Sequence, residues 1–385
     1  MKIAMLGHKA MPSTRGGIET VLTNLCPLLV SFGNSVVCYN RSSDKPEKEF
    51  EKDISGGCYK GVVLKKAGTL KIRGVSAMLA SFTAALKASF SDCDIVHFHA
   101  EGPCAAMFLP KMFGKKCVAT VHGLDWQREK WGKGFASKYI MRGEKTLVKY
   151  ADEVIVLSES AREYFKNTYG RETAVVPNGI SKPEILGDNI IKERFGLSKN
   201  SYICMVARLT EEKGAHYLIE AYKRIKTDKK LVICGAASDT DGYVSSLRRL
   251  AAENENIIFT GFISGDTLAQ IYSSAYLVCQ PSNIEGMSIS LLEALSYSNA
   301  VICSDIPENT AVCGDAAATF KKGDVNDFAD KLSFFINNPE ETERLKARSA
   351  EYVLSRFSWE KTARQTQEIY ERILKGEKKN VKSGK

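Results

Sequence analysis

The feature that most limits the fold of this chain is an alternation of short apolar runs with longer segments of helical spacing. The runs at residues 2–6, 153–157 and 202–206 are mostly apolar, as is typical of strands buried on both faces of a parallel sheet. In segments such as 325–337, apolar side chains recur every three or four positions, which predicts helices. This alternation continues through both halves without a sequence repeat. It predicts two doubly wound, Rossmann-like α/β domains.

The length of the chain and one break in the pattern set the predicted domains. At 385 residues the chain is long enough for two domains with separate cores. The Pro177-Asn178-Gly179 segment interrupts the strands and helices, so we expect the hinge there. The predicted parts are an N-terminal domain at 1–178, a C-terminal domain at 179–358, a helix at 359–375 that packs back on the first domain, and a basic, disordered tail at 376–385.

Two further expectations concern location. The first predicted strand begins at Lys2, which leaves no room for a signal peptide. No apolar run approaches the ~20 residues that span a bilayer. We therefore expect a cytoplasmic protein.

The net charge of +9 is unevenly distributed. Residues 1–180 hold 26 Lys and Arg against 17 Asp and Glu, whereas residues 181–385 hold 28 of each. This distribution favours an anionic partner for the first half, such as a membrane surface, a lipid-linked diphosphate or nucleic acid, with a solvated face as the alternative. The predicted helix at 134–150 combines basic with aromatic residues, so it could lie on an anionic membrane interface or be an ordinary surface helix.

The eleven cysteines show no C-x-x-C pair and no zinc-ligand spacing. Six of them lie in or beside apolar, strand-like runs, which predicts buried free thiols in a reducing compartment and no chemistry. These six are Cys38, Cys117, Cys204, Cys234, Cys279 and Cys303.

Three local predictions concern loops and caps. Residues 41–57 are polar and charged, which predicts a loop. Ser158 and Ser288 each precede a helical segment, so both are predicted N-caps.

In the second half, an apolar strand at 275–279 runs through a polar loop into a helical segment. Glu285 and Gly286 lie in this loop, and Glu293 follows about two helical turns later. A helix start offers free N–H groups and partial positive charge, which suit a diphosphate. Carboxylates accept hydrogen bonds from sugar hydroxyls, so this stretch suggests a nucleotide-sugar site. A solvated helix residue and a loop charge are the alternatives.

The loop that follows the predicted strand 202–206 carries two cations, Arg208 and Lys213. The guanidinium of an arginine can bind two phosphate oxygens, and a lysine acts as a mobile point charge. Together they could neutralise a diphosphate leaving group.

In the first half, Gly16 and Gly17 open a helix after the first strand, which is an anion-binding arrangement or a tight turn. The full G-x-G-x-x-G fingerprint is absent, which counts against a dinucleotide dehydrogenase. His97 and His99 share a strand face, so a metal pair is conceivable, but structural or acceptor-lining histidines are favoured. His122 follows another strand at the edge where ligands bind in open sheets.

These motifs resemble those of the retaining glycosyltransferases of family four, which have the two-domain GT-B fold. The resemblance rests on E-x7-E at Glu285 and Glu293, on A-R-L-x-x-E-K-G at residues 207–214, and on the glycine pair. The loop H-G-L-D-W-x-R-x-x-W at residues 122–131 resembles a subgroup that builds bacterial surface polysaccharides, rhamnosyltransferases among them. The resemblance extends from Lys2 to about Leu374.

The resemblance implies roles for these residues. Those implied at the reaction centre are His122, Arg208, Lys213 and Glu285. Those implied for the donor are Gly16, Gly17, Gly286, Met287, Ser288, Ile289 and Glu293, the last of these at the ribose. Those implied for the acceptor are Asp125, Arg128 and His99. Trp126 and Trp131 could equally anchor that loop in the core.

The resemblance also implies a reaction. The donor would be a UDP- or dTDP-linked sugar, and the acceptor a glycan linked to polyprenyl diphosphate, with an anionic membrane surface as a further partner. No cofactor, no metal and no nucleic acid are expected. Met287-Ser288 replaces the Phe-Gly or Phe-Pro that is common in the family, which leaves the donor sugar open. The alternatives are a GT-B sugar-nucleotide epimerase and a non-enzymatic protein that binds anions or nucleic acid.

Overall fold

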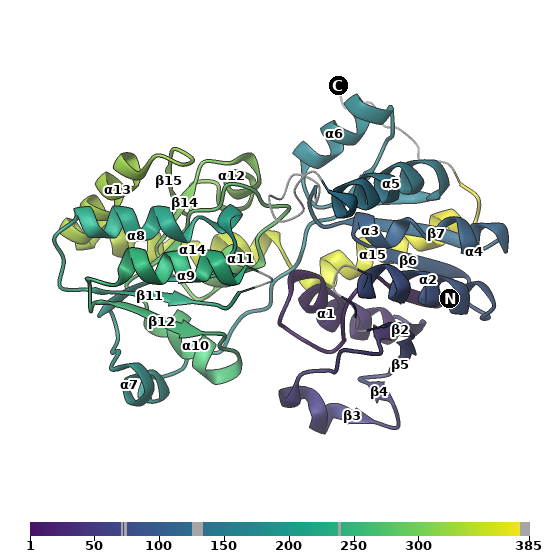
Figure 1. Ribbon diagram of the computed structural model, residues 1–385, viewed down its shortest axis with the longest axis horizontal. Helices are drawn as coiled ribbons and strands as arrows, with labels where there is room; N and C mark the ends of the chain where they lie inside the picture. Colours follow the sequence, from purple (N-terminus) through teal and green to yellow (C-terminus); the bar gives the residue numbers. More distant parts are fainter. Residues whose placement is uncertain (71, 73–74, 125–133, 238–239, 378–385) are drawn as a thin grey trace. The chain divides into compact units, whose positions relative to one another are not determined.

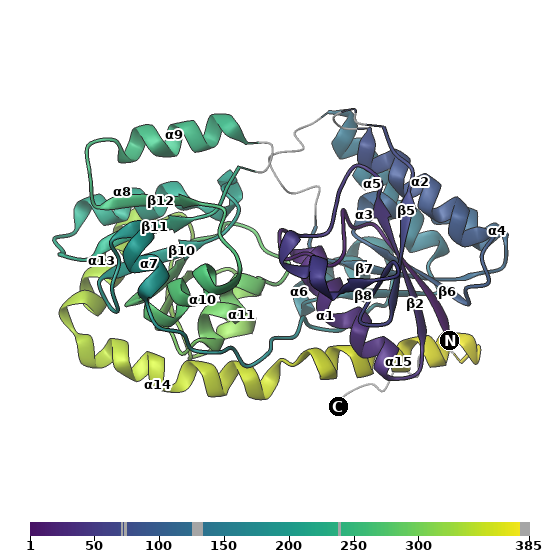
Figure 2. The same cartoon turned by 90° about the horizontal axis from the view of Figure 1, so that it is seen from below.

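The computed structural model describes residues 1–70, 72, 75–124, 134–237 and 240–377. The chain forms two compact units, which are described separately below (Figures 1 and 2). Unit 1 holds the described residues up to Gly179 together with those from Trp359 onward, and unit 2 holds Ile180–Ser358. No helix among the described residues combines the length and the apolar character that a membrane crossing requires.

Unit 1 is built on a sheet that has nine strands within the described residues, in the order β3-β4-β5-β2-β1-β6-β7-β8-β9. The strands are parallel from β5 to β9, whereas β3, β4 and β5 pair antiparallel at one edge. The strand bounds are β1 Lys2–Leu6, β2 Ser35–Arg41, β3 Ile54–Ser55, β4 Cys58–Tyr59, β5 Val62–Ala67, β6 Ile95–His99, β7 Lys116–Val121, β8 Glu153–Val156 and β9 Ala174–Val175.

Helices cover both faces of this sheet. One face is covered by α2, α3, α4, α5 and α6, whose apolar residues form one core with alternate residues of the strands. The other face carries α1, and α15 packs beside α1 although more than 300 residues separate them (Figure 2). The helix bounds are α1 Gly17–Ser31, α2 Ser76–Ser89, α3 Glu101–Cys104, α4 Phe108–Met112, α5 Phe135–Tyr150, α6 Glu159–Tyr169 and α15 Trp359–Leu374, with a 3-10 helix, η1, at Lys48–Asp53.

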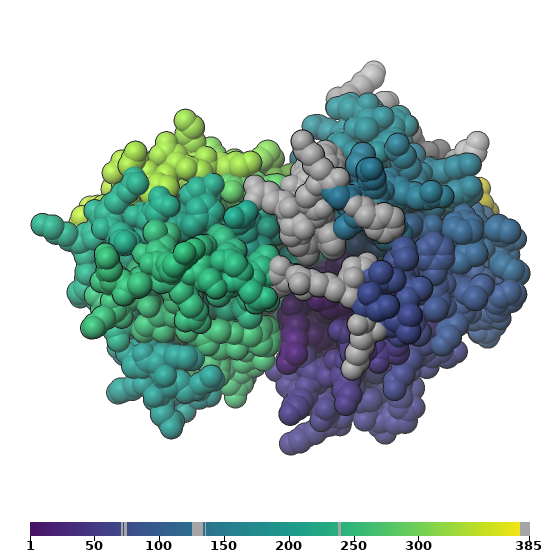
Figure 3. Space-filling view, in the orientation of Figure 1, coloured from purple at the N-terminus to yellow at the C-terminus, as the bar shows by residue number. Residues whose placement is uncertain are grey.

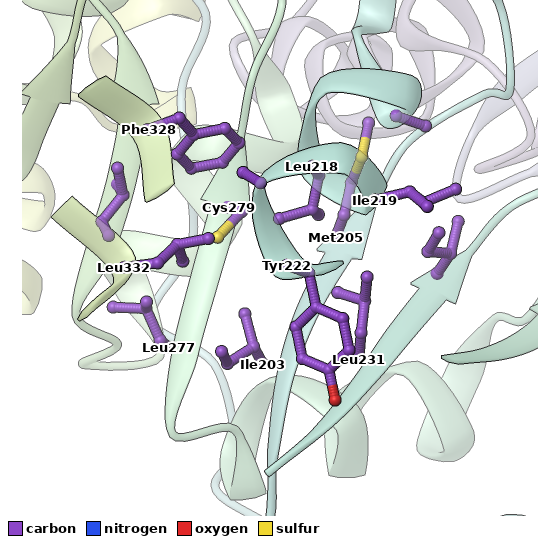
Figure 4. Packing of buried hydrophobic residues seen from close by; sticks show 14 of the residues in the cluster. Ile203, Met205, Leu218, Ile219, Tyr222, Leu231, Leu277, Cys279, Phe328 and Leu332 are labelled. Carbon is purple, nitrogen blue, oxygen red and sulfur yellow. The ribbon is translucent and has the colours of Figure 1, made fainter. Parts of the chain in front are cut away.

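Unit 2 is built on a parallel sheet whose six strands follow the order β12-β11-β10-β13-β14-β15 in the described residues. Because successive strand residues point to opposite faces, Ile203 and Met205 of β10 enter the core beneath α8, α9 and α13 (Figure 4). On the opposite face, the Tyr202 hydroxyl donates to the Ile271 carbonyl of α10. The strand bounds are β10 Tyr202–Val206, β11 Lys230–Cys234, β12 Ile257–Gly261, β13 Leu277–Gln280, β14 Val301–Ser304 and β15 Ala318–Phe320.

The helices of unit 2 lie between these strands along the chain. Their bounds are α7 Asn189–Phe195, α8 Ala215–Arg224, α9 Asp241–Ala251, α10 Gly265–Ser274, α11 Ile289–Ser296, α12 Pro307–Cys313, α13 Val325–Asn337 and α14 Pro339–Arg356, with a 3-10 helix, η4, at Glu211–Lys213.

Several local predictions are confirmed and one is wrong. The hydroxyl oxygens of Ser158 and Ser288 accept from the third residue beyond each, as N-caps do. All eleven cysteines lie in the described residues as free thiols, and all but Cys58 are buried. The predicted loop at 41–57 instead contains η1 and β3. The prediction failed because β3 and β4 are only two residues long, which is too short to show an apolar pattern.

Close contact between two helices of unit 1 gives a first prediction. Gly143 of α5 lies against the backbone of α3, so a Cβ at this position would be 2.0 Å from the Glu101 carbonyl oxygen. Gly143→Ala should therefore lower the free energy of unfolding by about 1–3 kcal/mol. Gly242→Ala in α9 is the matched control. Its Cβ would meet nothing within 4 Å, so it should stabilise by about 0.5–1 kcal/mol.

Urea unfolding of both variants, followed by circular dichroism, measures the difference. Wild-type stability in Gly143→Ala would show that α5 can move away from α3 without cost.

Candidate active site

The strand order of unit 2 places two loops side by side at the carboxyl edge of its sheet. From β10 the chain continues outward to β11 and β12, and it then returns to β13 on the other side of β10. The order therefore reverses between β10 and β13, and such a switch point is where open α/β sheets bind ligands. The loop after β10 carries Arg208 and Lys213, and the loop after β13 carries Glu285.

The two loops are in direct contact. Gly214 has φ +71°, and a Cβ there would lie 2.0 Å from the Pro281 carbonyl oxygen. The Asn283 backbone N–H donates to the Glu212 carbonyl at 2.8 Å. Only glycine combines this left-handed conformation with so close an approach. Gly214 therefore fixes the distance between the loops.

This contact brings Lys213 and Glu285 together. Lys213 Nζ lies 2.5 Å from Glu285 Oε1, and their side chains are only 12% and 7% exposed. A buried ion pair of this kind holds a cation and a carboxylate at fixed positions, since separating them would leave a desolvated charge. Arg208, which is half-buried, precedes this pair on the same loop.

A network around Gln280 holds the Glu285 carboxylate from the other side. The Gln280 amide nitrogen lies 3.1 Å from Glu285 Oε1 and 3.0 Å from Ser282 Oγ. Ser282 Oγ donates to the same carboxylate oxygen at 2.7 Å. The Gln280 amide oxygen accepts from Ser290 Oγ at 3.3 Å, which links the loop to α11. Glu285 Oε1 thus lies within reach of three donors, one from the loop after β10 and two from the end of β13 and the loop that follows it.

The start of α11 lies at the end of this network. Gly286 is partly exposed and Met287 is buried, and both precede the N-cap Ser288. Ser288 Oγ accepts from the Leu291 N–H, and α11 begins at the half-buried Ile289. Gln280 links this first turn to Glu285, and the free N–H groups of such a turn suit an anion.

Glu293 lies on α11 in surroundings that oppose its charge. Tyr272 OH lies 3.3 Å from Glu293 Oε2, and the Tyr272 and Tyr297 rings stack with centroids 5.2 Å apart. Burial raises the pKa of Glu293 to about 7, and the bond from Tyr272 lowers it less. This carboxyl is therefore poised to change its protonation state when hydrogen-bond donors arrive.

In unit 1 the strand order reverses between β1 and β6, so the loops after these strands are also neighbours. A Cβ on Gly7 would lie 2.2 Å from the His99 carbonyl oxygen. The loop after β1 is held by Asn40, whose amide oxygen accepts from His8 Nε2 at 2.8 Å, and by the buried Glu47, which pairs with Arg15 at 2.9 Å. This loop is therefore ordered by side chains outside it.

The glycine pair ends this loop at the start of α1. Gly16 is the N-cap and Gly17 the first helical residue. A Cβ on Gly16 would lie 2.2 Å from Glu19 Oε2, and Glu19 Oε1 accepts from the Lys9 N–H at 2.8 Å. The absence of a side chain at Gly16 thus leaves room for a carboxylate of the same helix.

Three histidines lie together at the carboxyl edge of β6 and β7. His99 Nδ1 lies 3.0 Å from His122 Nε2, and the His97 and His99 rings stack at 4.3 Å. His97 is bonded to Thr120 at 2.7 Å and to Tyr370 of α15 at 2.5 Å. Burial lowers the pKa of His97 to about 3 and also lowers that of His99, so both rings are neutral at pH 7.

No group of three or more His, Cys, Asp or Glu within the described ranges has the arrangement of a metal site. His97 is instead a structural residue, since its two ring nitrogens are both bonded within unit 1. Asp125, Arg128, Trp126 and Trp131 lie outside the described residues.

Several residues that build the site were missed from the sequence. Gln280, Tyr272, Asn40 and Glu47 carry no motif, although Gln280 stands out as a polar residue that ends an apolar strand. Chemically, the site of unit 2 offers the held ammonium group of Lys213 and a helix start for an anion. It also offers two carboxylates for hydroxyl groups.

Comparison with known proteins identifies the kind of chain that carries this site. The family model for glycosyltransferase family 4 matches residues 15–182, and the model for glycosyl transferases group 1 matches residues 188–352. Alpha-maltose-1-phosphate synthase of Mycolicibacterium smegmatis is 27% identical over 405 residues, which cover 97% of this chain and 100% of that protein. The capsular polysaccharide biosynthesis glycosyltransferase CapM of Staphylococcus aureus is 25% identical over 67% of this chain and 70% of its own length.

Solved structures agree on the fold. The structure of Anabaena Alr3699/HepE in complex with UDP and glucose has a TM-score of 0.79 at 16% identity, and the match covers 96% of this chain and 99% of that one. Sucrose-phosphate synthase from Thermosynechococcus elongatus has a TM-score of 0.79 at 19% identity over 97% of this chain and 99% of its own. The two family models, the full-length relative and these folds show that the chain belongs to the group 1, family-four glycosyltransferases, enzymes of GT-B fold that act on sugar-nucleotide donors.

Proposed function

We propose that this protein is a retaining, metal-independent hexosyltransferase of cell-surface polysaccharide synthesis. It moves a sugar from a UDP- or dTDP-linked donor to a hydroxyl of a glycan that is linked to polyprenyl diphosphate. It works in the cytoplasm, at the inner face of the plasma membrane. The likeness to CapM supports the polysaccharide assignment.

The observation that carries the proposal is the Lys213–Glu285 pair at the switch point of unit 2. A donor brings a diphosphate and a sugar, and the pair offers a cation to the first and a carboxylate to the second. When the diphosphate attracts Lys213, Glu285 Oε1 becomes available to a sugar hydroxyl. Sugar recognition would thus depend on the presence of the diphosphate.

The neighbouring residues take the remaining groups of the donor. Arg208 joins Lys213 in neutralising the leaving diphosphate. The backbone from Gly286 through Met287 and Ser288 to Ile289 binds the donor at the start of α11. Glu293 accepts from the ribose hydroxyls.

Residues of unit 1 serve the acceptor and the reaction centre. Gly16 and Gly17 bind the donor phosphate, and His122 lines the reaction centre. His99, Asp125 and Arg128 bind the acceptor, with Arg128 at its phosphate. The bond between His99 and His122 supports a joint role for the two rings.

The proposed step needs no protein base. The bond between the anomeric carbon and the diphosphate oxygen breaks, and the acceptor oxygen bonds to the same face of that carbon. The proton of the acceptor hydroxyl passes to the departing phosphate oxygen. Lys213 and Arg208 stabilise the negative charge that develops on the diphosphate.

Two alternative functions would differ from glycosyl transfer in the products that they form. An epimerase would convert the donor without an acceptor, and a binding protein would convert nothing. The two glycosyltransferase family models, one on each half of the chain, favour transfer over both.

A panel of UDP, dTDP and GDP, with and without their common sugars, tests the donor site by thermal shift. A ligand that binds only the folded protein raises its melting temperature. We expect a shift with one nucleotide that disappears in Glu293→Ala. Glu253→Ala, which changes an exposed residue just after α9, should keep the full shift. Absence of a shift with every nucleotide would contradict the proposal.

A further inference from the structure

Four large apolar side chains gather on the surface of unit 1 where α2 and α4 end. Leu86, Phe90, Met112 and Phe113 are 46%, 70%, 75% and 48% exposed, respectively. We call these four residues the apolar tip. Single exposed apolar residues are ordinary, but a contiguous group on one spot marks a surface that meets an apolar partner.

The apolar tip is held in place by contacts between the two helices. The Phe90 and Phe113 rings pack edge to face with centroids 4.6 Å apart. Behind them, Phe82 of α2 and Phe108 of α4 pack at 6.4 Å. The segment that contains both helices, drawn in blue, forms a continuous part of the surface (Figure 3). The apolar tip is thus a preformed surface.

Lysines surround the apolar tip. Lys87 Nζ donates to the Lys66 carbonyl, and Lys115 Nζ donates to the carbonyls of Ser91 and Cys93, so these positive charges are held by neutral acceptors. The lysines on the strands and helix ends around the tip outnumber the aspartates. The lysines are Lys2, Lys65, Lys66, Lys87, Lys111, Lys115 and Lys116, and the aspartates are Asp92, Asp94 and Asp152.

An open hollow adjoins the apolar tip. It measures about 480 Å³ and is lined by Tyr39, Lys65, Leu86, Lys87, Phe90 and Ser91. Apolar walls with lysines at the rim fit a lipid, whose acyl part would lie against Leu86 and Phe90 and whose anionic headgroup would meet Lys65 and Lys87.

We propose that the apolar tip and its lysines are the surface by which this protein docks on an anionic phospholipid membrane. Projecting aromatic, Met and Leu side chains with lysines beside them are the composition of interfacial anchors. A stable protein partner would need a large complementary area, whereas a membrane accepts a small projecting tip. A second copy fits poorly, because a two-fold contact would bring like lysines together.

The position of the tip agrees with docking during catalysis. Phe90 and Phe113 precede β6 and β7, so the tip lies at the amino edge of the sheet. The histidines and the glycine loop lie at the carboxyl edge, which stays accessible when the tip is covered. The inference rests on the membrane association proposed above and names its surface, but it does not depend on the transfer reaction.

Co-sedimentation of the full chain with vesicles tests the docking surface. We compare phosphatidylcholine alone with phosphatidylcholine containing phosphatidylglycerol. Wild type should bind the anionic vesicles, and added salt should weaken that binding. Lys65→Glu/Lys87→Glu should weaken it at least about tenfold, since each basic residue near the surface contributes, and Phe90→Ser/Phe113→Ser should weaken it similarly.

Two controls separate this surface from others. Phe334→Ser in unit 2 removes a phenylalanine as exposed as Phe113, 48% in each case, and should bind as wild type. Lys138→Glu/Arg142→Glu changes the exposed basic face of α5, the helix for which the sequence left a membrane interface open. A loss of binding confined to this α5 variant would overturn the assignment of the tip.

The remaining outcomes are equally decisive. Indifference of wild type to anionic vesicles at low salt would overturn the proposal, as would wild-type binding by both tip variants. A wild-type dimer in light scattering that the tip variants convert to monomers would assign the tip to a second copy. The nucleotide thermal shift of each variant reports the donor site separately, so a failure of docking is distinguishable from a failure of the proposed function.

Discussion

Lys213→Met should lower kcat/KM by about 10²–10³-fold and destabilise unit 2 by about 3–5 kcal/mol. The first effect follows because the variant lacks a cation that faces the departing diphosphate. The second follows because Glu285, with a side chain only 7% exposed, loses the ammonium group 2.5 Å away and is left as a buried charge without its cation. Transfer assays and urea unfolding measure the two effects separately.

A double variant separates stability from catalysis. Lys213→Met/Glu285→Gln removes both charges, so it should recover most of the lost stability while the transfer activity stays low. Arg364→Met is the matched control, because its pair with Glu360 has both side chains more than 60% exposed and should contribute below about 1 kcal/mol. If Lys213→Met unfolded at the urea concentration of wild type, the pair would have no stabilising role.

The affinity for the nucleotide should rise with pH up to about pH 7 and then level off. In the unliganded protein, burial raises the pKa of Glu293 to about 7, so its carboxyl is protonated below that pH. Ribose hydroxyls that donate to the carboxylate favour its charged form and lower its pKa. Binding therefore releases a proton, and each pH unit below 7 should cost up to about tenfold in affinity.

Calorimetry in buffers of different ionisation enthalpy measures this proton release. Glu293→Gln should abolish the share of the pH dependence that belongs to the protein, and what remains reports the phosphate of the nucleotide itself. Equal pH profiles for wild type and variant would show that Glu293 does not meet the nucleotide.

The raised pKa of Glu293 also makes the free energy of unfolding depend on pH. Because its folded pKa of about 7 lies above the value of 4.5 for an unperturbed group, the folded state keeps a proton that the unfolded state releases between these values. The contribution of this proton to the free energy of unfolding is therefore complete below pH 4.5. It is lost as pH rises to about 7, by about 3 kcal/mol in total. Glu293→Gln should remove this slope from the urea-unfolding profile.

The sequence by itself determined the features that depend on neighbouring residues. The predicted bounds of β10 and α13 match the structure, and those of α15 differ by one residue, because burial imposes a period on each segment that is visible locally. The caps at Ser158 and Ser288 were predictable for the same reason, since a cap bonds to an N–H three residues away. The fold class followed from the order of these elements, and the candidate donor residues followed from motifs within single loops.

The tertiary structure alone decided the contacts across the sheet. Lys213 and Glu285 are 72 residues apart, and they meet because β10 and β13 are neighbours and Gly214 allows their loops to touch. The strand β5 was also missed, since Lys65 and Lys66 interrupt its apolar pattern and only its pairing with β2 and β4 defines it.

The charge state of Glu293 and the apolar tip both depend on contacts between different elements of the fold. Tyr272 of α10 meets Glu293 of α11, and Phe90 meets Phe113 between two other helical segments. Pairings of this kind depend on which elements become neighbours. The sequence pattern of one segment does not show which elements become its neighbours, because that arrangement is decided by the free energy of burying the whole core.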